Sequence, residues 1–222
     1  AASDVYKRQD VVSAQRAESR RKLGISPEVF MVVITGGSRG ARTINRAMIS
    51  VHEHFKGDKE ICLYHITGNL EYDKIVRELG LTDGKSFGEG SRIIKYEYDM
   101  PAVLAAADLI ICRAGAVSLA ELAARELPSI LIPYPYASGD HQTFNARVFV
   151  KAEAAKMIAD KYVTEKELIQ DINDFRHQPE TLERMSEATK KIKKIYAGAD
   201  IAQLLSLIHI SEPTRHLRTS YA

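Results

Sequence analysis

The chain has 222 residues, of which 45% are hydrophobic and 27% are charged. These proportions are ordinary for a soluble globular domain, and the sequence contains no internal repeat or low-complexity segment. Lysine and arginine total 31 against 29 aspartates and glutamates, so no bulk charge favours nucleic acid as a partner. No apolar run approaches the roughly 20 residues that span a bilayer, and no signal peptide is visible. We therefore expect a cytoplasmic protein.

The two cysteines carry no signal of a disulfide or a metal site. Cys62 and Cys112 each sit in an apolar run, without a C-x-x-C spacing or a histidine-rich neighbourhood. Such cysteines are typical of buried thiols in a reducing compartment.

The two ends of the chain share an unusual property of their coding. DVYKRQ (Asp4–Gln9) and LSLIHI (Leu205–Ile210) can be written as reverse-complementary codons. That string, continued by SEPTR, resembles the transposon-end adapter of shotgun sequencing libraries. We therefore expect residues 1–9 and 205–222 to be translated adapter, and residues 10–204 to be one natural domain cut from a longer gene.

The first elements predict a buried strand followed by a glycine loop. Residues 11–23 form a charged helical pattern that stops at Gly24, and residues 29–34 are a β-branched apolar run typical of a central parallel strand. The sequence TGGSRGARTINRAM then places three glycines between this strand and a helix. Such a loop can cradle phosphate groups. Its glycines are Gly36, Gly37 and Gly40.

A second interpretation of the glycine loop is a nicotinamide site. TGGSRGA is similar to the cofactor loop of short-chain dehydrogenases, and Tyr162 and Lys166 form a Y-x-x-x-K pair downstream. Against it, Thr164 and Glu167 have the spacing of a helix-capping box. Arg42 also stands where that fingerprint has a glycine. An NADP-dependent reductase therefore remains as an alternative.

The middle of the chain continues the alternation of strands and helices. We expect strands at residues 61–67 and 92–96, a helix at 70–79 and a surface loop at 84–90. His65 near the end of the first of these strands is either a ligand contact or a core histidine. Pro101 is well placed at a helix start.

The stretch from residue 108 to residue 145 predicts an anion site. Residues 108–112 read as a strand that breaks at Arg113-Ala114-Gly115, and apolar spacing from Ala116 indicates a helix that Pro128 ends. A glycine before a helix N-terminus lets free N–H groups approach an anion. Glu121, early in that helix, either binds the diol of a sugar or is a solvated glutamate.

The remaining elements complete an α/β pattern. We expect strands at residues 129–132 and 154–159, an N-cap at Asp140, and closing helices at 164–175 and 179–197. The second closing helix carries lysines 190, 191, 193 and 194, which we assign to a solvated face. The fold class predicted is α/β, a Rossmann-like parallel sheet with helices on both faces.

Three segments in one order resemble a known family. GGSRGARTINRAM, YEYDM, and CRAGAVSLAELAARELPSILIPYP followed by DHQTFNA are similar to the C-terminal, donor-binding half of the MurG family, the GT-B glycosyltransferases of family 28. That resemblance implies transfer of N-acetylglucosamine from UDP-GlcNAc to a lipid-linked muramyl pentapeptide, with inversion and no cofactor. It also implies a peripheral enzyme on the cytoplasmic face of the membrane.

The resemblance also implies what this segment lacks. The family's candidate base and its acceptor site lie in an N-terminal half that does not occur here, so we expect little transferase activity from this chain alone and no identifiable catalytic residue. A related GT-B enzyme that glycosylates another lipid would use the same donor architecture. The sequence contains no D-x-D, so we expect no metal.

Residue roles follow from the resemblance by position. The resemblance implies that Tyr96 covers the uracil, that the backbone of Glu97 reads the base edge, and that Glu121 binds the ribose hydroxyls. The alternative for Tyr96 is a core aromatic. Arg113 either neutralises the diphosphate or shapes its loop. The other implied donor contacts are Ser38 in the glycine loop, Ala116, Val117 and Ser118 beneath the diphosphate, and His141 and Gln142 at the sugar hydroxyls.

Overall fold

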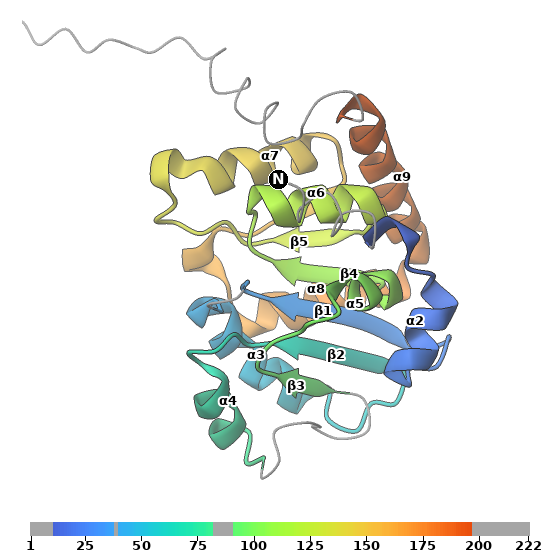
Figure 1. Cartoon of the computed structure of the whole chain (residues 1–222). Coiled ribbons are helices and arrows are strands. Elements are labelled where there is room, and N and C mark those ends of the chain that lie inside the picture. The colour runs from blue at the N-terminus through green and yellow to red at the C-terminus, as the bar shows by residue number, and fades with distance from the viewer. Residues whose placement is uncertain (1–10, 38–39, 82–90, 197–222) are drawn as a thin grey trace, which may run out of the picture.

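Six short strands pair in parallel in the order β3-β2-β1-β4-β5-β6, and helices cover both faces of this sheet (Figure 1). The computed structural model describes residues 11–37, 40–81 and 91–196. The strands are β1 Phe30–Thr35, β2 Ile61–Ile66, β3 Arg92–Ile94, β4 Leu109–Cys112, β5 Ser129–Leu131 and β6 Ala155–Met157. The α-helices are α2 Arg16–Leu23, α3 Arg42–His54, α4 Tyr72–Glu78, α5 Met100–Ala106, α6 Ala116–Arg125, α7 His141–Lys151, α8 Glu165–His177 and α9 Pro179–Tyr196. Two short 3-10 helices are η1 Ser138–Asp140 and η2 Asp160–Tyr162.

The strand order confirms the predicted Rossmann-like fold. The chain moves outward from β1 through β2 to β3, then returns to pair β4 with the other side of β1. The order therefore reverses between β1 and β4. In open parallel sheets, ligands bind at the carboxyl ends of the strands at this reversal. The loops that follow β1 and β4 are the glycine loop and the stretch from Arg113 to Gly115.

The core lies on both faces of the sheet because successive strand residues point in opposite directions. Met31 and Val33 of β1 belong to a cluster that also contains buried residues of α5, α6, α7 and α9. Val32 and Ile34 belong to a second cluster, which includes Ile44 of α3 and residues of α8. This two-sided burial explains why the β1 sequence is continuously apolar rather than alternating.

The two cysteines are buried and free, as expected. Cys62 lies in β2 and Cys112 ends β4. Burial raises the pKa of the Cys62 thiol to about 11 and that of Cys112 to about 12, because the thiolate loses solvation. Both therefore behave as small apolar side chains at neutral pH.

Three predicted elements differ from the structure at their ends. The expected helix over 11–23 is interrupted at residues 14–15, and α2 begins only at Arg16; its left-handed Gly24 cap is as predicted. β3 ends at Ile94 rather than residue 96, and β6 spans only Ala155–Met157. Both are edge strands, and each ends where its single partner strand ends, at Ile66 and Leu131.

Asp140 precedes α7 but does not cap it as expected. Its backbone has a positive φ of 54°, and its carboxylate accepts a hydrogen bond from the Thr143 hydroxyl at 2.6 Å instead of from a backbone N–H. The left-handed backbone points the side chain away from the first N–H groups of the helix. The predicted loop at 84–90 and the expected adapter segments lie outside the described residues.

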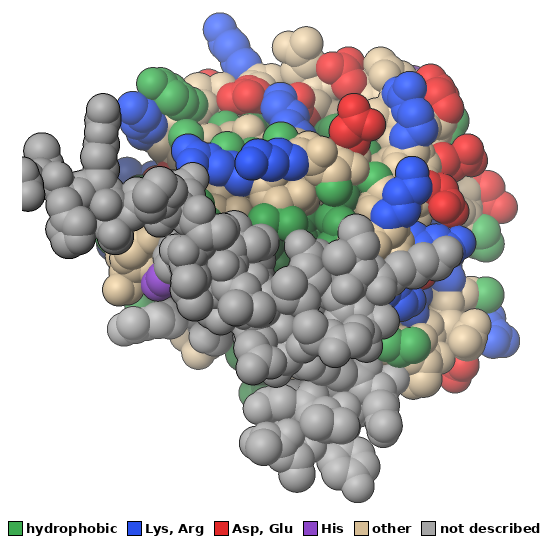
Figure 2. All heavy atoms as spheres, turned by 90° about the horizontal axis from the view of Figure 1, so that it is seen from above, with side chains coloured by type: hydrophobic (Ala, Val, Ile, Leu, Met, Phe, Trp, Pro, Cys, Tyr) green, Lys and Arg blue, Asp and Glu red, His purple; other side chains and the backbone are tan. Residues whose placement is uncertain are grey.

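Two lysines of α9 lie beside carboxylates. Lys190 lies 3.4 Å from Glu187, and Lys193 lies 3.0 Å from Glu126. Figure 2 views the molecule from above, and its visible surface carries blue and red side chains interspersed. Among the described helices, none is long and apolar enough to cross a membrane.

Candidate functional site

The glycine loop after β1 is a tight turn packed onto its neighbours. A Cβ at Gly36 would lie 2.1 Å from the backbone nitrogen of Ala41, and one at Gly40 would lie 2.1 Å from the carbonyl oxygen of Thr67. Gly37 and Gly40 also have positive φ values of 80° and 78°. Side chains are therefore excluded at Gly36 and Gly40, and all three glycines line the cavity beside the loop. Ser38 lies outside the described residues.

The N-terminus of α6 faces the same cavity. Gly115 is its N-cap in extended conformation, and no side chain caps the helix. The first N–H groups of a helix have no intrahelical partner, and they carry the positive end of the helix dipole. Ser118 lines the cavity, whereas the Val117 side chain is 70% exposed. The N–H groups of Ala116, Val117 and Ser118 thus form a site that suits an anion.

These two features line one cavity of about 710 Å³ between the ends of β1 and β4. We call it the glycine-loop cavity. It opens at the strand-order reversal, where a parallel sheet binds ligands. Its other walls come from the start of α3, from the loop before α7 and from η2. Its lining residues include Thr35, Arg42, Glu71, Tyr134, Tyr136 and Asp160.

Arg113 supports the walls of the glycine-loop cavity. Its Nη1 donates to the carbonyl oxygens of Ile132 and Pro133 at 3.1 and 3.2 Å, and it lies 2.5 Å from Asp160 Oδ1. The guanidinium also lies over the Tyr134 ring at 5.5 Å. The Asp160 carboxylate offsets the positive charge of this guanidinium, and the two carbonyls fix its position. Of its two predicted roles, this geometry favours shaping of the loop.

Gln142 connects the cavity to α7. Its side-chain oxygen accepts hydrogen bonds from the backbone nitrogens of Ala114 and Tyr134, at 3.2 and 3.0 Å. Its side-chain amide thereby holds two wall segments together and itself lines the cavity. His141, the other predicted sugar contact, is exposed on the first turn of α7 and is absent from the described lining residues.

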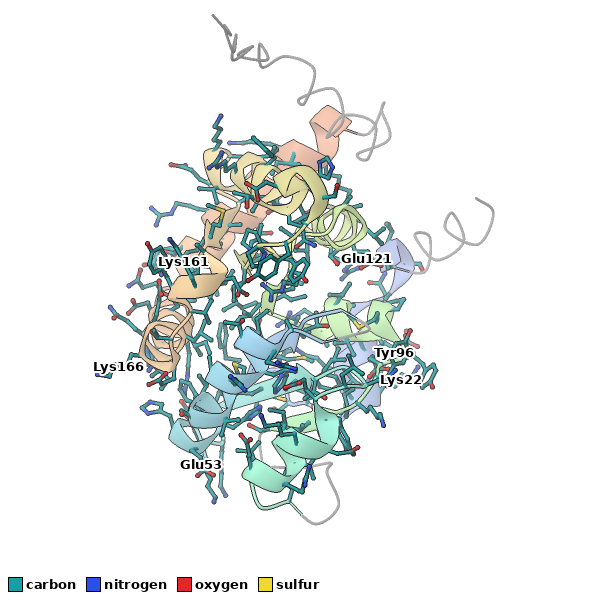
Figure 3. All side chains as sticks on the ribbon, turned by 90° about the vertical axis from the view of Figure 1, so that its left-hand side faces the viewer. Lys22, Glu53, Tyr96, Glu121, Lys161 and Lys166 are labelled. Atoms are coloured by element: carbon teal, nitrogen blue, oxygen red, sulfur yellow. The ribbon has the colours of Figure 1, made fainter. Side chains whose placement is uncertain are left out.

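A second cavity, of about 740 Å³, contains the other predicted donor contacts. Tyr96, Glu97 and Glu121 all line it, and we call it the tyrosine cavity. Tyr96 is 45% exposed, and its ring packs edge-on against Tyr98 with centroids 4.9 Å apart. Figure 3 looks onto the carboxyl edge of the sheet and shows Tyr96 and Glu121 on the same side of it. Glu121 and Ser118 belong to one helix, so α6 connects both cavities.

The loop that carries Tyr96 is held by its acidic neighbours. Glu97 Oε2 accepts a hydrogen bond from the Tyr64 hydroxyl at 2.5 Å, and Glu97 Oε1 accepts from the backbone nitrogen of Asp99 at 2.7 Å. Asp99 in turn caps α5 by accepting from the nitrogen of Ala102. Burial, together with the adjacent Glu97 carboxylate, raises the pKa of Tyr64, which therefore stays protonated and donates.

The two cavities differ in charge. Glu18, Glu97, Asp99 and Glu121 line the tyrosine cavity, and Lys22 is the only cationic side chain among its described lining residues. In the glycine-loop cavity, Arg42 lies 3.3 Å from Glu71 and Arg113 pairs with Asp160, so the side-chain charges balance. The backbone N–H groups at the start of α6 therefore make the glycine-loop cavity suitable for an anion. The acidic tyrosine cavity instead suits a neutral group that donates hydrogen bonds.

The alternative pair Tyr162 and Lys166 does not join the glycine loop. Tyr162 is 62% exposed in η2, and neither residue lines the glycine-loop cavity. Figure 3 shows Lys166 on the opposite side of the molecule from Tyr96. As predicted, the Thr164 hydroxyl caps α8 by accepting from the nitrogen of Glu167 at 3.2 Å. The arrangement needed for a reductase is therefore not formed.

A buried polar chain behind the glycine loop contains Asn45 and settles the role of His65. Asn45 Nδ2 donates to the carbonyl oxygen of Thr67 at 2.9 Å, and Asn45 Oδ1 lies 3.0 Å from His65 Nε2. His65 Nδ1 lies 3.2 Å from His52 Nε2. Because the amide oxygen can only accept, both histidines carry their proton on Nε2. His65 is thus a core residue, and burial lowers its pKa well below the ordinary value.

Sequence patterns missed several residues of the site. Asp160 neutralises Arg113 from 47 positions away, and Lys22 reaches the tyrosine cavity from a helix that precedes the first strand. The only signal for Lys22 was its place on a charged helix. Such contacts depend on tertiary packing between distant segments.

Comparisons with known proteins show the family to which the chain belongs. Residues 31–201 match the family model of the glycosyltransferase family 28 C-terminal domain. A relative from Desulforudis audaxviator, named UDP-N-acetylglucosamine--N-acetylmuramyl-(pentapeptide) pyrophosphoryl-undecaprenol N-acetylglucosamine transferase, is 39% identical over 199 residues, which is 89% of this chain and 53% of that protein. A relative of the same name from Halalkalibacterium halodurans is 40% identical over 185 residues, 82% of this chain and 49% of that protein.

A solved structure shares the fold. The crystal structure of MurG from Acinetobacter baumannii aligns with a TM-score of 0.63 at 22% sequence identity, over 90% of this chain and 55% of that one. The chain thus spans about half the length of the curated relatives that it matches. On the family match over residues 31–201, this chain belongs to glycosyltransferase family 28 and contains its C-terminal domain.

Proposed function

We propose that this chain is the donor-binding half of an inverting N-acetylglucosaminyltransferase of peptidoglycan synthesis, and that UDP-GlcNAc is its ligand. The names of its relatives state such a transferase, with a pyrophosphoryl-undecaprenol acceptor. We assign the acceptor site and the catalytic base to the part of those relatives that this chain does not match. By itself the chain would bind the donor and transfer it poorly, because orientation of both reactants carries much of the rate.

The observation that carries this proposal is the pairing of two unlike cavities across one helix. The acidic tyrosine cavity suits a nucleoside, and the glycine-loop cavity suits an anion. α6 contributes Glu121 to the first and Ser118 to the second. A nucleotide-sugar has the same order of parts: a base and ribose, then a diphosphate, then a sugar. We place the uracil at Tyr96, the ribose at Glu121 and the diphosphate at the start of α6.

The chemistry supplied by this half is stabilisation of the leaving group. When an acceptor hydroxyl attacks the anomeric carbon, the bond to the diphosphate oxygen breaks and negative charge develops on UDP. Preorganised N–H groups at a helix start stabilise such charge, because they need no reorganisation during the reaction. The glycine loop, with Gly36, Gly37 and Gly40, forms the opposite wall. We assign the sugar hydroxyls to Gln142, which lines the glycine-loop cavity, and to the neighbouring His141 at the start of α7. In this proposal neither a metal nor a cofactor is required.

The location proposed for the complete enzyme follows from its acceptor. A pyrophosphoryl-undecaprenol substrate is anchored in a membrane, so the enzyme would work as a peripheral protein at the cytoplasmic surface. This half would contact only the water-soluble donor.

Calorimetric titration tests the proposal, with UDP-GlcNAc, UDP-glucose and NADPH as separate ligands. We expect UDP-GlcNAc to bind in preference to the other two. Binding of NADPH alone would support the reductase instead. Equal affinity for both UDP-sugars would favour a related lipid glycosyltransferase with a different donor. A folded sample that binds none of them would contradict donor binding by this chain.

A further inference from the structure

The segment before β1 forms a wall of the tyrosine cavity although it precedes the family-matched domain. The family match begins at residue 31. Nevertheless seven residues between Val11 and Lys22 line the cavity that Tyr96 and Glu121 share. Figure 3 shows Lys22 beside Tyr96, below Glu121. A nucleoside in this cavity would therefore contact or approach the segment from residue 11 to residue 22, which we call the N-terminal wall.

The N-terminal wall is held firmly against the domain. Arg20, only 3% exposed, donates to the carbonyl oxygens of Ala106, Ser26, Pro27 and Val29 at 2.8–3.0 Å, and its Nη2 lies 2.6 Å from Asp108 Oδ2. All of its donor groups thus have partners in the domain. A buried arginine with this many partners fixes the position of its helix.

A second arginine fastens the start of the wall. Arg125, at the end of α6, donates to the carbonyl oxygens of Val11 and Ala14 at 3.2 and 2.9 Å. The wall is consequently attached to the same helix that carries Glu121. A segment anchored at both ends can present a side chain in a defined place.

Lys22 connects the N-terminal wall to the loop that carries Tyr96 and Glu97. Its ammonium forms an ion pair with Asp99 Oδ2. The backbone nitrogen of Asp99 is bound by Glu97, and Asp99 Oδ1 caps α5. Lys22, Asp99 and Glu97 therefore form a chain of contacts that ends one residue from Tyr96. In a cavity lined by four carboxylates, this cation also offsets their mutual repulsion.

We propose that Lys22 is a positioning residue for nucleobase recognition: through Asp99 it fixes the loop of Tyr96 and Glu97, and so sets the preference for uracil over cytosine. This inference rests on the proposed donor site. The diphosphate and sugar contacts lie in the other cavity, so loss of Lys22 loosens base recognition and leaves those contacts in place.

The test compares UDP and CDP binding to the full chain by calorimetry, because the two ligands share their ribose and diphosphate. Lys22→Met removes the ion pair, and Lys22→Arg retains it. Asp99→Asn removes the same pair from the other side while keeping an acceptor that can cap α5. Lys74→Met is the matched control, since Lys74 forms a comparable exposed pair with Glu78 on α4, far from the cavity.

We expect Lys22→Met and Asp99→Asn each to weaken UDP binding about fivefold and to reduce the ratio of CDP to UDP dissociation constants. The double variant should be no worse than either single one, Lys22→Arg should restore the ratio, and Lys74→Met should match the wild type. If the wild type prefers UDP and Lys22→Met keeps that preference unchanged, the positioning role is wrong although the donor site stands. If the wild type binds neither nucleotide, the proposed donor site itself is wrong, and this inference with it.

Discussion

Gly40 packs directly on the carbonyl oxygen of Thr67, so that a Cβ at Gly40 would lie 2.1 Å from that oxygen. The same oxygen accepts the side-chain amide of Asn45, which continues through His65 to His52. The Thr67 carbonyl after β2 thus contacts both the glycine loop and the buried polar chain. The glycine-loop wall of the proposed anion site therefore depends on the buried residues Asn45, His65 and His52.

The first prediction compares two glycines of this loop. Both Gly37 and Gly40 have positive φ, but a Cβ at Gly37 would meet nothing within 4 Å. Gly37→Ala should therefore reduce the free energy of unfolding by about 1 kcal/mol, the cost of the backbone conformation alone. Gly40→Ala should cost about 3 kcal/mol, because the loop must also move off Thr67. Urea denaturation measures both, and equal losses for the two variants would contradict the packing described.

The buried histidines predict a dependence of stability on pH. Burial lowers the pKa of His52 to about 3 and that of His65 well below 6.5, so both stay neutral in the folded protein. In the unfolded chain they bind protons below about pH 6.5. The unfolded state then binds more protons, and stability falls as the pH drops from about 6.5, by up to about 1.4 kcal/mol per pH unit for each histidine.

His52→Gln tests this linkage, because glutamine keeps a donor for His65 Nδ1 and does not titrate. The slope of unfolding free energy against pH between 6.5 and 4 should become shallower in this variant. The exposed His54 provides the control, and His54→Gln should leave the slope as it is. Identical slopes in all three proteins would show that the buried pair does not carry the effect.

Substitution of Arg20 tests how strongly the N-terminal wall is attached to the domain. Arg20→Met should lower the free energy of unfolding by about 3 kcal/mol, since it removes the partner of five acceptors in a buried place. The loss stays near this value because Asp108 keeps Arg16 and the nitrogen of Met31 as partners. Arg21, exposed on the same helix, is the matched control. Thermal denaturation of Arg20→Met and Arg21→Met should separate them clearly, and a common melting temperature would refute the anchor.

Substitution of Glu121 should reduce affinity for the donor without reducing the stability of the fold. Glu121→Ala should weaken UDP-GlcNAc binding about tenfold, because hydrogen bonds from the ribose hydroxyls to a carboxylate are lost. Its melting temperature should change little. Glu78→Ala, on the exposed face of α4, should alter neither quantity. If Glu121→Ala instead melts early while folded molecules bind normally, the ribose role is wrong.

The fold was predictable where a local pattern has one physical explanation. The run VFMVVI is typical of a strand buried on both faces, and Gly24 ends α2 in the left-handed conformation that glycine favours. α6 ends at Arg125 with Glu126 in a left-handed conformation, before the predicted stop at Pro128. Strand ends were predicted less well, since β3 and β6 end where their partner strands end. No local pattern near residue 94 or 157 contains that information.

The site was predictable from its backbone motifs and less so from its side-chain partners. The glycine loop and the start of α6 were expected to form phosphate sites, and they line one cavity. The ion pair of Arg113, however, needs Asp160, and the wall of the tyrosine cavity depends on Arg20 and Asp108, which are 88 residues apart. Such pairs follow from tertiary packing, which brings distant segments together.

A crystal structure of this chain with UDP-GlcNAc tests the central claim most directly. We expect the uracil beside Tyr96, the ribose hydroxyls within hydrogen-bond distance of Glu121, and the diphosphate at the N-terminus of α6 facing the glycine loop. The sugar should then lie near Gln142. A nucleotide bound in the reverse direction, with its diphosphate in the acidic tyrosine cavity, or bound away from both cavities, would contradict the account.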